Sequence, residues 1–373
     1  ITMQQFNQGI TRIVIVLFLL PFFNGALAQS SNIFKASNIK ASMLKVSDWQ
    51  MKHSNGKPEN TWTNAAFYTG VVAAYETTKS KVLLDSLMTI GERNNWLPAK
   101  RYDHADDIAI TQTYVDLYRI SQNELMLKAS IDSIKKMMLM PGGEIKRHGI
   151  TWWWCDALFM APPTLAKLSK TFNDPSYLVL SDTLFMQCYR LLYNNEEKLF
   201  ARDATYLIDA SGNGKRESNG KKVFWSRGNG WVMAGLVRLL TEMPADHPTR
   251  AFYINLFKDM SARLLSLQQE DGLWRTSLLD PAAYAGGEGS GSAFNCYAMA
   301  WGLNNKILDK KIFLPAVKAA WTGLNTLLTS EGKVGWVQPI GADPKRNFNA
   351  ESWESYGAGA FLLAGSEVIK LKN

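Results

Sequence analysis

The stretch Thr151-Trp-Trp-Trp-Cys-Asp-Ala-Leu-Phe-Met160 places three consecutive tryptophans directly before one carboxylate and an apolar run. Tryptophan is costly to expose and aspartate is seldom buried without a partner, so the combination is unusual. Apolar residues at helical spacing continue the pattern to Lys170. Pro162 and Pro163 should interrupt that helix partway. The stretch therefore predicts a helix that begins near Thr151 and carries Asp156 on its first turns.

Asp156 should lie against the aromatic rings of Trp152 and Trp153 on this helix. A carboxylate surrounded by aromatic rings loses its hydration, which raises its pKa toward the range of a general acid. Aromatic faces also stack on sugar rings. The alternative role for Asp156 is a first-turn carboxylate that complements the helix dipole. The stretch alone favours neither role.

The composition is that of a folded protein with a large core. Hydrophobic residues make up 46% of the 373 residues, enough for one or two domains. The net charge of +8 is spread in short runs, which suits an anionic substrate and gives no reason to expect a nucleic-acid partner.

The N-terminus has the pattern of a targeting segment. Arg12 precedes the apolar run 13–23, and Ala26-Leu-Ala28 offers a small-residue cleavage site. The run is too short to span a bilayer. We therefore expect a signal peptide over 1–28, a single catalytic domain over 29–373, a periplasmic or secreted product, and no membrane association after cleavage.

Cysteine and histidine usage argues against metal and redox chemistry. Cys155, Cys188 and Cys296 form a sparse, odd-numbered set within apolar helical patterns, which predicts buried free thiols rather than a disulfide framework. No metal-ligand spacing, phosphate-binding loop or dinucleotide fingerprint occurs. We expect neither a metal site nor a cofactor.

Helical periodicity extends from Ala36 to the C-terminus, and two helix types alternate. Helices rich in Gly and Ala begin near residues 62, 107, 152, 229, 292 and 354, and nearly all are paired with an amphipathic helix. A recurrence of this kind with weak sequence identity is typical of helical arrays. Small residues allow inner helices to crowd around an axis. The sequence predicts an all-α (α/α)6 barrel of six helical hairpins, with an open solenoid as the alternative.

In such a barrel the loops that precede the six inner helices share one mouth, so the residues at those positions should converge. They are Trp62, Asn64, His104, Asp106, Asp107, Trp152, Trp153, Asp156, Trp225, Arg227, Asn229, Trp231, Glu288, Ser290, Ser292, Glu351, Trp353 and Glu354. Asp106 and Asp107 could instead be helix caps, and Arg227 could form a surface ion pair. Recurrence at the same place in successive hairpins favours the functional interpretation.

The predicted mouth combines carboxylates with stacking aromatics, a pattern typical of glycoside chemistry. Arg227, within Trp225-Ser-Arg-Gly-Asn-Gly-Trp231, offers a planar fork for a substrate carboxylate. The residues thus indicate a hydrolase or a lyase that acts on an acidic sugar.

Three blocks carry a family resemblance: Trp153-Trp-Cys-Asp-Ala-Leu-Phe-Met160, Arg227-Gly-Asn-Gly-Trp231 and Glu288-Gly-Ser-Gly-Ser-Ala-Phe294. From about residue 40 to the C-terminus the chain resembles the unsaturated rhamnogalacturonyl hydrolases of glycoside hydrolase family 105, which are related to the unsaturated glucuronyl hydrolases of family 88. The resemblance implies an (α/α)6 barrel and, as substrate, an oligosaccharide that ends in an unsaturated uronic acid. Removal of that uronate proceeds by protonation and hydration of its enol ether.

The resemblance also implies roles for individual residues. Asp156 would be the proton donor and then the base for water, and Asp107 would be the second carboxylate, with Asp106 as the rival assignment. Arg227 would hold the uronate carboxylate, with Trp231 and Trp153 as sugar platforms. His104, Trp152, Arg202, Trp225, Asn229, Glu288, Ser290 and Ser292 complete the expected substrate-binding set.

One segment departs from the family pattern. Many relatives carry a histidine-containing segment where this chain has Leu199-Phe-Ala-Arg-Asp203, so Arg202 or Asp203 takes the place of that histidine. The next sugar could therefore be rhamnose, another neutral sugar, or a sulfated sugar of an algal polysaccharide. Two rival functions remain at this point: a polysaccharide lyase, and a non-catalytic protein that binds acidic oligosaccharides.

Overall fold

The computed structural model describes residues 32–140 and 147–372 of the chain. The predicted signal peptide, 1–28, lies outside the described residues. Within them, no helix combines the length and the apolar character needed to cross a membrane.

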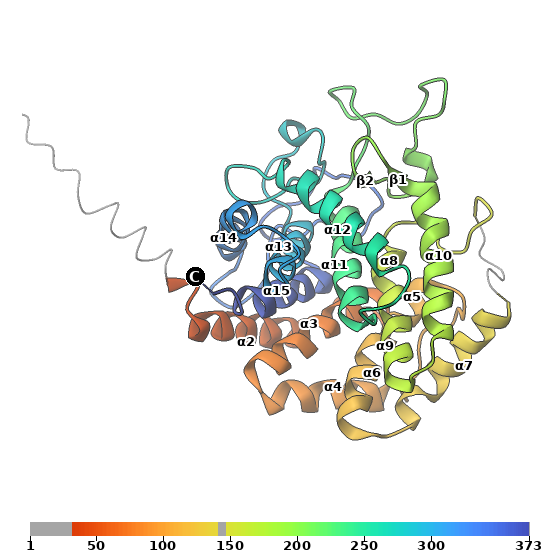
Figure 1. Ribbon diagram of the computed structural model, residues 1–373. Helices are drawn as coiled ribbons and strands as arrows, with labels where there is room; N and C mark the ends of the chain where they lie inside the picture. The colour runs from red at the N-terminus through yellow and green to blue at the C-terminus, as the bar shows by residue number, and fades with distance from the viewer. Residues whose placement is uncertain (1–31, 141–146, 373) are drawn as a thin grey trace, which may run out of the picture.

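The described residues are mostly helical (Figure 1). The helices are α2 (Ala36–Lys52), α3 (Trp62–Thr78), α4 (Lys81–Arg93), α5 (Ala105–Ile108), α6 (Thr111–Ser121), α7 (Leu125–Leu139), α8 (Ala157–Met160), α9 (Pro162–Phe172), α10 (Ser176–Leu192), α11 (Ser226–Glu242), α12 (Arg250–Leu265), α13 (Gly289–Asn304), α14 (Lys310–Thr326) and α15 (Ser355–Val368). Two short 3-10 turns span Ala204–Tyr206 and Pro281–Ala283. Strands β1 (Tyr193–Asn194) and β2 (Leu199–Phe200) pair antiparallel, with Tyr193 opposite Phe200.

The inner helices form a closed ring. Each inner helix packs on the next in the order α3, α6, α9, α11, α13 and α15, and α15 packs on α3. The outer partners are α4, α7, α10, α12 and α14, and α2 covers α15 and α3. This closure confirms the predicted (α/α)6 barrel and excludes the open solenoid.

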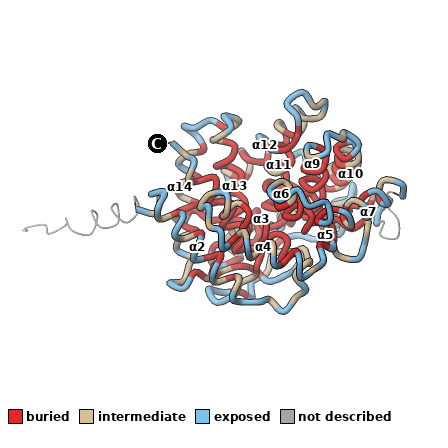
Figure 2. Tube along the Cα trace, turned by 90° about the horizontal axis from the view of Figure 1, so that it is seen from below, coloured by how far each residue is buried: buried red, intermediate tan, exposed pale blue. Residues whose placement is uncertain are grey.

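Small residues allow the inner helices to approach closely, as the sequence indicated. A Cβ atom on Gly70 of α3 would lie 2.4 Å from the carbonyl oxygen of Gly359 of α15, and one on Gly235 of α11 would lie 2.2 Å from that of Leu158. Side chains larger than hydrogen would force these backbones apart. Buried positions therefore concentrate on the inner ring, and exposure increases outward (Figure 2).

The decisive stretch differs from its predicted form. The helix starts at Ala157 rather than near Thr151, and it breaks at Ala161 before Pro162 starts α9. Residues 152–155 are held by the segment after β2: the Cys155 amide donates to the Arg202 carbonyl at 2.9 Å, and Trp154 forms an isolated bridge with Asp203. These bonds satisfy backbone groups that a longer helix would have used. The break at the prolines is confirmed.

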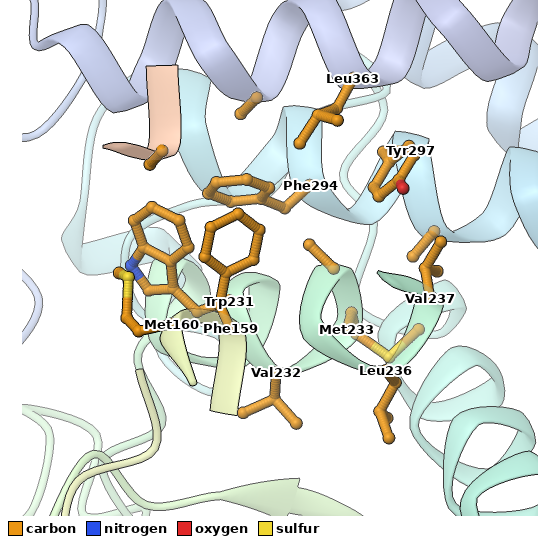
Figure 3. Packing of buried hydrophobic residues seen from close by; sticks show 14 of the residues in the cluster. Phe159, Met160, Trp231, Val232, Met233, Leu236, Val237, Phe294, Tyr297 and Leu363 are labelled. Carbon is orange, nitrogen blue, oxygen red and sulfur yellow. The ribbon is translucent and has the colours of Figure 1, made fainter. Parts of the chain in front are cut away.

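An aromatic core fills the ring below the mouth. Trp231 of α11 packs on Phe294 of α13 with ring centroids 4.3 Å apart, and on Phe159 of α8 at 4.7 Å (Figure 3). Trp231 is only 1% exposed. The side chains of three successive inner hairpins thus meet on the barrel axis.

Candidate active site

Asp156 immediately precedes α8 at the mouth of the barrel and is 9% exposed. Its Oδ2 lies 3.4 Å from Nε of Arg202, and the Cys155 thiol is 3.8 Å from its Oδ1. Burial raises the pKa of Asp156 above its usual range, against the opposing influence of Arg202 and Arg227. A desolvated carboxyl of this kind retains a proton that it can donate.

Arg202 is brought beside Asp156 by the β1–β2 hairpin. Its Nη1 donates to Asp203 at 2.7 Å, and its side chain is 20% exposed. Although burial opposes ionisation, hydrogen bonds from Thr205 and Arg202 lower the pKa of Asp203. The segment that departs from the family pattern therefore lies in the site, with Arg202 between two carboxylates.

Asp106 and Asp107 are neighbours in α5 but have different surroundings. Asp107 accepts two hydrogen bonds from the Arg101 guanidinium at 2.5 and 3.1 Å, and a third at 2.8 Å from the Arg101 amide. Within the described residues, the Asp106 carboxylate accepts no hydrogen bond and has only His104 Nδ1 at 3.8 Å. Burial and the charge of Asp156 raise the pKa of Asp106 to about 7. Asp106 is thus subject to the charge of Asp156, whereas the Asp107 carboxylate is engaged by Arg101.

His104 supports this carboxylate as a neutral ring. Its Nδ1 accepts the Asp106 amide at 3.3 Å, and burial together with Arg101 lowers its pKa to about 4. Its ring lies 4.5 Å from that of Trp154. Trp154 was absent from the predicted set, although it adjoins the two tryptophans that were included.

The Trp153 ring, which the sequence predicted to stack on a sugar, already contacts other side chains. The Arg147 guanidinium carbon lies 4.2 Å from the centroid of its ring, that of Arg202 lies 5.6 Å away, and the Trp154 ring is 5.0 Å away. The indole is therefore already in contact with two cations and an aromatic ring. Arg147 was not predicted, because nothing in the local pattern links it to Trp153.

Arg227 was predicted to hold a substrate carboxylate, and the structure corrects this expectation. Its terminal nitrogens donate to the carbonyls of Gln338 and Pro339, its guanidinium stacks on Trp225 and Tyr356 at 4.4 and 4.7 Å, and it is 1% exposed. Trp225 is itself buried and donates to Gln338 at 3.3 Å. Both side chains anchor the 338–339 segment, so no open fork faces the solvent.

Several other predicted contacts are also structural. Asn229 exchanges hydrogen bonds of 2.8 and 3.0 Å with the Phe200 backbone, which docks β2 on α11. Glu288 caps α13, accepting from the Ser290 amide at 3.2 Å and the Ser290 hydroxyl at 2.7 Å. Ser292 accepts from the Trp274 amide at 2.9 Å. Glu288, Ser290, Ser292, Asn229 and Trp152 are all 0% exposed and Trp231 is 1% exposed, which corrects the expectation that these side chains contact substrate.

Gln338 joins this buried group, and the sequence gave no signal for it. Its backbone amide donates to the Glu288 carboxylate at 3.1 Å, and its backbone carbonyl accepts from the Tyr356 hydroxyl at 2.7 Å. Its side-chain amide donates to the Asp343 carbonyl at 2.9 Å. A loop residue some 50 positions from Glu288 therefore completes the hydrogen bonding at the start of α13.

The opposite end of the barrel holds a cavity of about 780 Å³, lined by the C-terminal ends of the inner helices. Its charges are largely paired: Glu242 accepts from Arg119 at 3.0 Å and from Lys167 at 3.2 Å, and Lys167 also contacts Asp116 at 2.5 Å. This network joins α6, α9 and α11. At the mouth, by contrast, the Asp106 carboxylate and the Arg147 guanidinium have no close partner of opposite charge among the described residues. The mouth is therefore the better candidate for chemistry.

All three cysteines are buried and free, as predicted. No group of three or more His, Cys, Asp or Glu side chains among residues 32–140 and 147–372 is arranged to hold a metal ion.

Comparison with known proteins places the chain among glycoside hydrolases. Residues 38–372 match the Glycosyl Hydrolase Family 88 model. An unsaturated 3S-rhamnoglycuronyl hydrolase of Formosa agariphila is 44% identical over 90% of this chain and 92% of its own length. One of an Alteromonas species is 34% identical, over 90% of this chain and 84% of its own length.

Solved structures agree. A family 88 hydrolase from Bacteroides vulgatus superposes with a TM-score of 0.82 at 30% identity, over 90% of this chain and 99% of its own. A protein described as a polysaccharide lyase gives the same TM-score at 32% identity, over 90% of this chain and 97% of its own. The family model and the hydrolase relatives cover nearly the whole chain, and the resemblance seen in the three sequence blocks is confirmed. The chain belongs to glycosyl hydrolase family 88 and is a glycoside hydrolase.

Proposed function

We propose that this hydrolase removes the terminal 4,5-unsaturated uronic acid from an oligosaccharide in which the next sugar is a sulfated rhamnose. The observation that carries the reaction is the pair of desolvated carboxyls, Asp106 and Asp156, of which only Asp156 has an arginine partner. The two relatives described as unsaturated 3S-rhamnoglycuronyl hydrolases support the substrate class, with 3S taken as a sulfate at O3 of rhamnose.

The two carboxyls form a coupled acid–base unit. The charge of Asp156 raises the pKa of Asp106, so the pair binds one proton more tightly than an isolated carboxylate would. Arg202 stabilises the ionised form of Asp156 once that proton has left. We assign proton donation to Asp156 and the supporting role to Asp106, in place of Asp107, whose oxygens are engaged by Arg101.

The reaction needs one acid rather than two carboxylates flanking an acetal. Asp156 protonates C4 of the unsaturated uronate, and water adds at C5 as its proton returns to the carboxylate. The hemiketal formed at C5 opens to a ketone, and the hemiacetal left at C1 releases the next sugar. A single desolvated acid with a nearby cation suits this sequence of steps.

The proposal is tested with lyase-digested polysaccharides, whose unsaturated uronate absorbs in the near ultraviolet. Addition of the protein to a digest that contains 3-sulfated rhamnose should reduce this absorbance, and Asp156→Asn should abolish the change. A rise in absorbance on undigested polymer would establish a lyase instead. Binding of the digest with no change in absorbance by the wild-type protein would establish a non-catalytic binding protein.

We also propose that the enzyme is exported, on the strength of the charged, apolar and small-residue pattern of residues 1–28. Expression of the full chain in a bacterial host, followed by fractionation and N-terminal sequencing, should recover a product that begins after Ala28 outside the cytoplasm. Recovery of the uncleaved chain from the cytoplasm would refute export.

A further inference from the structure

Arg147 is an exposed cation at the edge of the site, and it has no acidic partner within residues 32–140 and 147–372. Among the described residues, its guanidinium makes neither an ion pair nor a hydrogen bond, and its guanidinium carbon lies 4.2 Å from the centroid of the Trp153 ring. Arg202, on the same ring at 5.6 Å, is balanced by Asp156 and Asp203. Of the two arginines on Trp153, Arg202 is thus paired with carboxylates, whereas Arg147 has no counter-charge in the part of the chain that the structure describes.

The backbone holds Arg147 in this position. Arg147 and Ile150 exchange backbone hydrogen bonds of 3.2 and 3.1 Å around a two-residue turn. Both central residues have positive φ, 53° at His148 and 77° at Gly149, as the tight turns of hairpins require. The paired turn fixes the backbone at Arg147, whose guanidinium lies on the indole of Trp153.

A guanidinium stacked on an aromatic face keeps its edge N–H groups free. Those groups match two oxygens of a planar or tetrahedral oxyanion, and stacking removes part of the side-chain entropy that binding would otherwise cost. The contact with Trp153 itself contributes little at an exposed site, so it orients the cation rather than neutralising it.

We propose that Arg147, held on the face of Trp153, binds the sulfate ester of the sugar next to the unsaturated uronate. The inference rests on the proposed function, because it takes the reacting uronate to lie at Asp156 and Arg202. Trp153 is the element that connects the two positions, since it contacts both Arg202 beside the acid and Arg147 farther toward the solvent. Arg147 thus distinguishes sulfated from unsulfated substrates.

The test compares a sulfated unsaturated disaccharide with its desulfated counterpart. Arg147→Ala should lower kcat/KM on the sulfated compound by about 10- to 100-fold, mainly through KM, and leave kcat/KM on the desulfated one within about twofold. Arg147→Lys should retain part of the preference, because it keeps the charge but loses the fork. Lys310→Ala, at the exposed start of α14, removes one positive charge elsewhere. This control should leave kcat/KM on both disaccharides unchanged.

A second measurement separates binding from turnover. In the Asp156→Asn background, calorimetry should show that Arg147→Ala weakens binding of the sulfated disaccharide alone. Equal losses on both disaccharides, or none on the sulfated one, would overturn the assignment while leaving the proposed reaction intact. If the wild-type protein binds neither disaccharide and removes the chromophore from neither, the proposed function itself fails, and the inference fails with it.

Discussion

The mouth of the barrel has two halves built from the same residue types and used in opposite ways. The half around α11, α13 and the 338–339 segment buries Arg227, Asn229 and Glu288 with nearly every polar group bonded. The half around α5 and α8 places the Asp156–Arg202 pair beside two groups, the Asp106 carboxylate and the Arg147 guanidinium, that have no close partner of opposite charge among the described residues. An unsatisfied charge costs stability in the free protein, and a substrate that pairs with it recovers that energy. The first half therefore fixes the geometry, and the second performs the chemistry.

The largest expected effect tests the half of the mouth around α5 and α8. Asp156→Asn should lower kcat by about 10²- to 10⁴-fold, because the amide cannot donate the proton that C4 must receive. Its melting temperature should stay the same or rise, since a buried ionisable carboxyl has been replaced by a neutral amide of the same size. A near-UV assay and thermal unfolding on the same preparation check both. Loss of folding would indicate that Asp156 is a helix-terminal structural residue.

A smaller loss of activity distinguishes two adjacent carboxylates. Asp106→Asn should reduce kcat by about 10²-fold by removing the partner of the acid. It should also move the alkaline limb of the rate profile to lower pH, because the pair loses the carboxyl whose pKa is raised to about 7.

Asp107→Asn is the matched control for this pair. It should mainly lower the free energy of unfolding, by about 1–2 kcal/mol, because Arg101 loses its charged partner and is half exposed. Turnover per folded molecule should change little. The reverse pattern would restore Asp107 as the second carboxylate.

The buried half should respond in stability rather than in rate. Glu288→Ala removes the cap of α13 and leaves the Gln338 amide without its acceptor, so the free energy of unfolding should fall by about 1–3 kcal/mol. Urea unfolding measures the loss, and kcat corrected for the folded fraction should stay close to that of the wild type. A large fall in kcat without destabilisation would place Glu288 in the reaction.

The last expected effect is a pH dependence of stability. Asp106 has a pKa of about 7 in the folded protein against 3.8 as its ordinary value, so the unfolded chain releases this proton first. The folded state therefore loses stability as pH rises from about 4 to about 7. Asp106→Asn should remove that loss, giving a gain in melting temperature that is largest near pH 8 and vanishes near pH 4. A gain independent of pH would contradict the raised pKa.

The fold followed from the sequence because its signals are local and repeated. The alternation of small-residue and amphipathic helices located all six hairpins, and the glycines of α3 and α15 do meet at the backbone. The helix predicted from Thr151 was wrong at its start, because backbone pairing with 202–203 takes residues 152–155 out of the helical pattern. That partner lies almost fifty residues away, and no local signal reports it.

The sequence by itself determined the barrel, the family and the position of Asp156 among aromatic residues, since each depends on residue types at short spacing. Only the tertiary structure decided which polar residues at the mouth are available to a substrate. Composition and spacing do not show which of Arg227 and Arg147 is available to a substrate. The carbonyls of Gln338 and Pro339 accept hydrogen bonds from the first, whereas the second lies on the face of Trp153 and has no hydrogen-bond partner in the described ranges 32–140 and 147–372. Availability depends on whether distant segments already satisfy a side chain's hydrogen bonds, and those segments meet only when the ring closes.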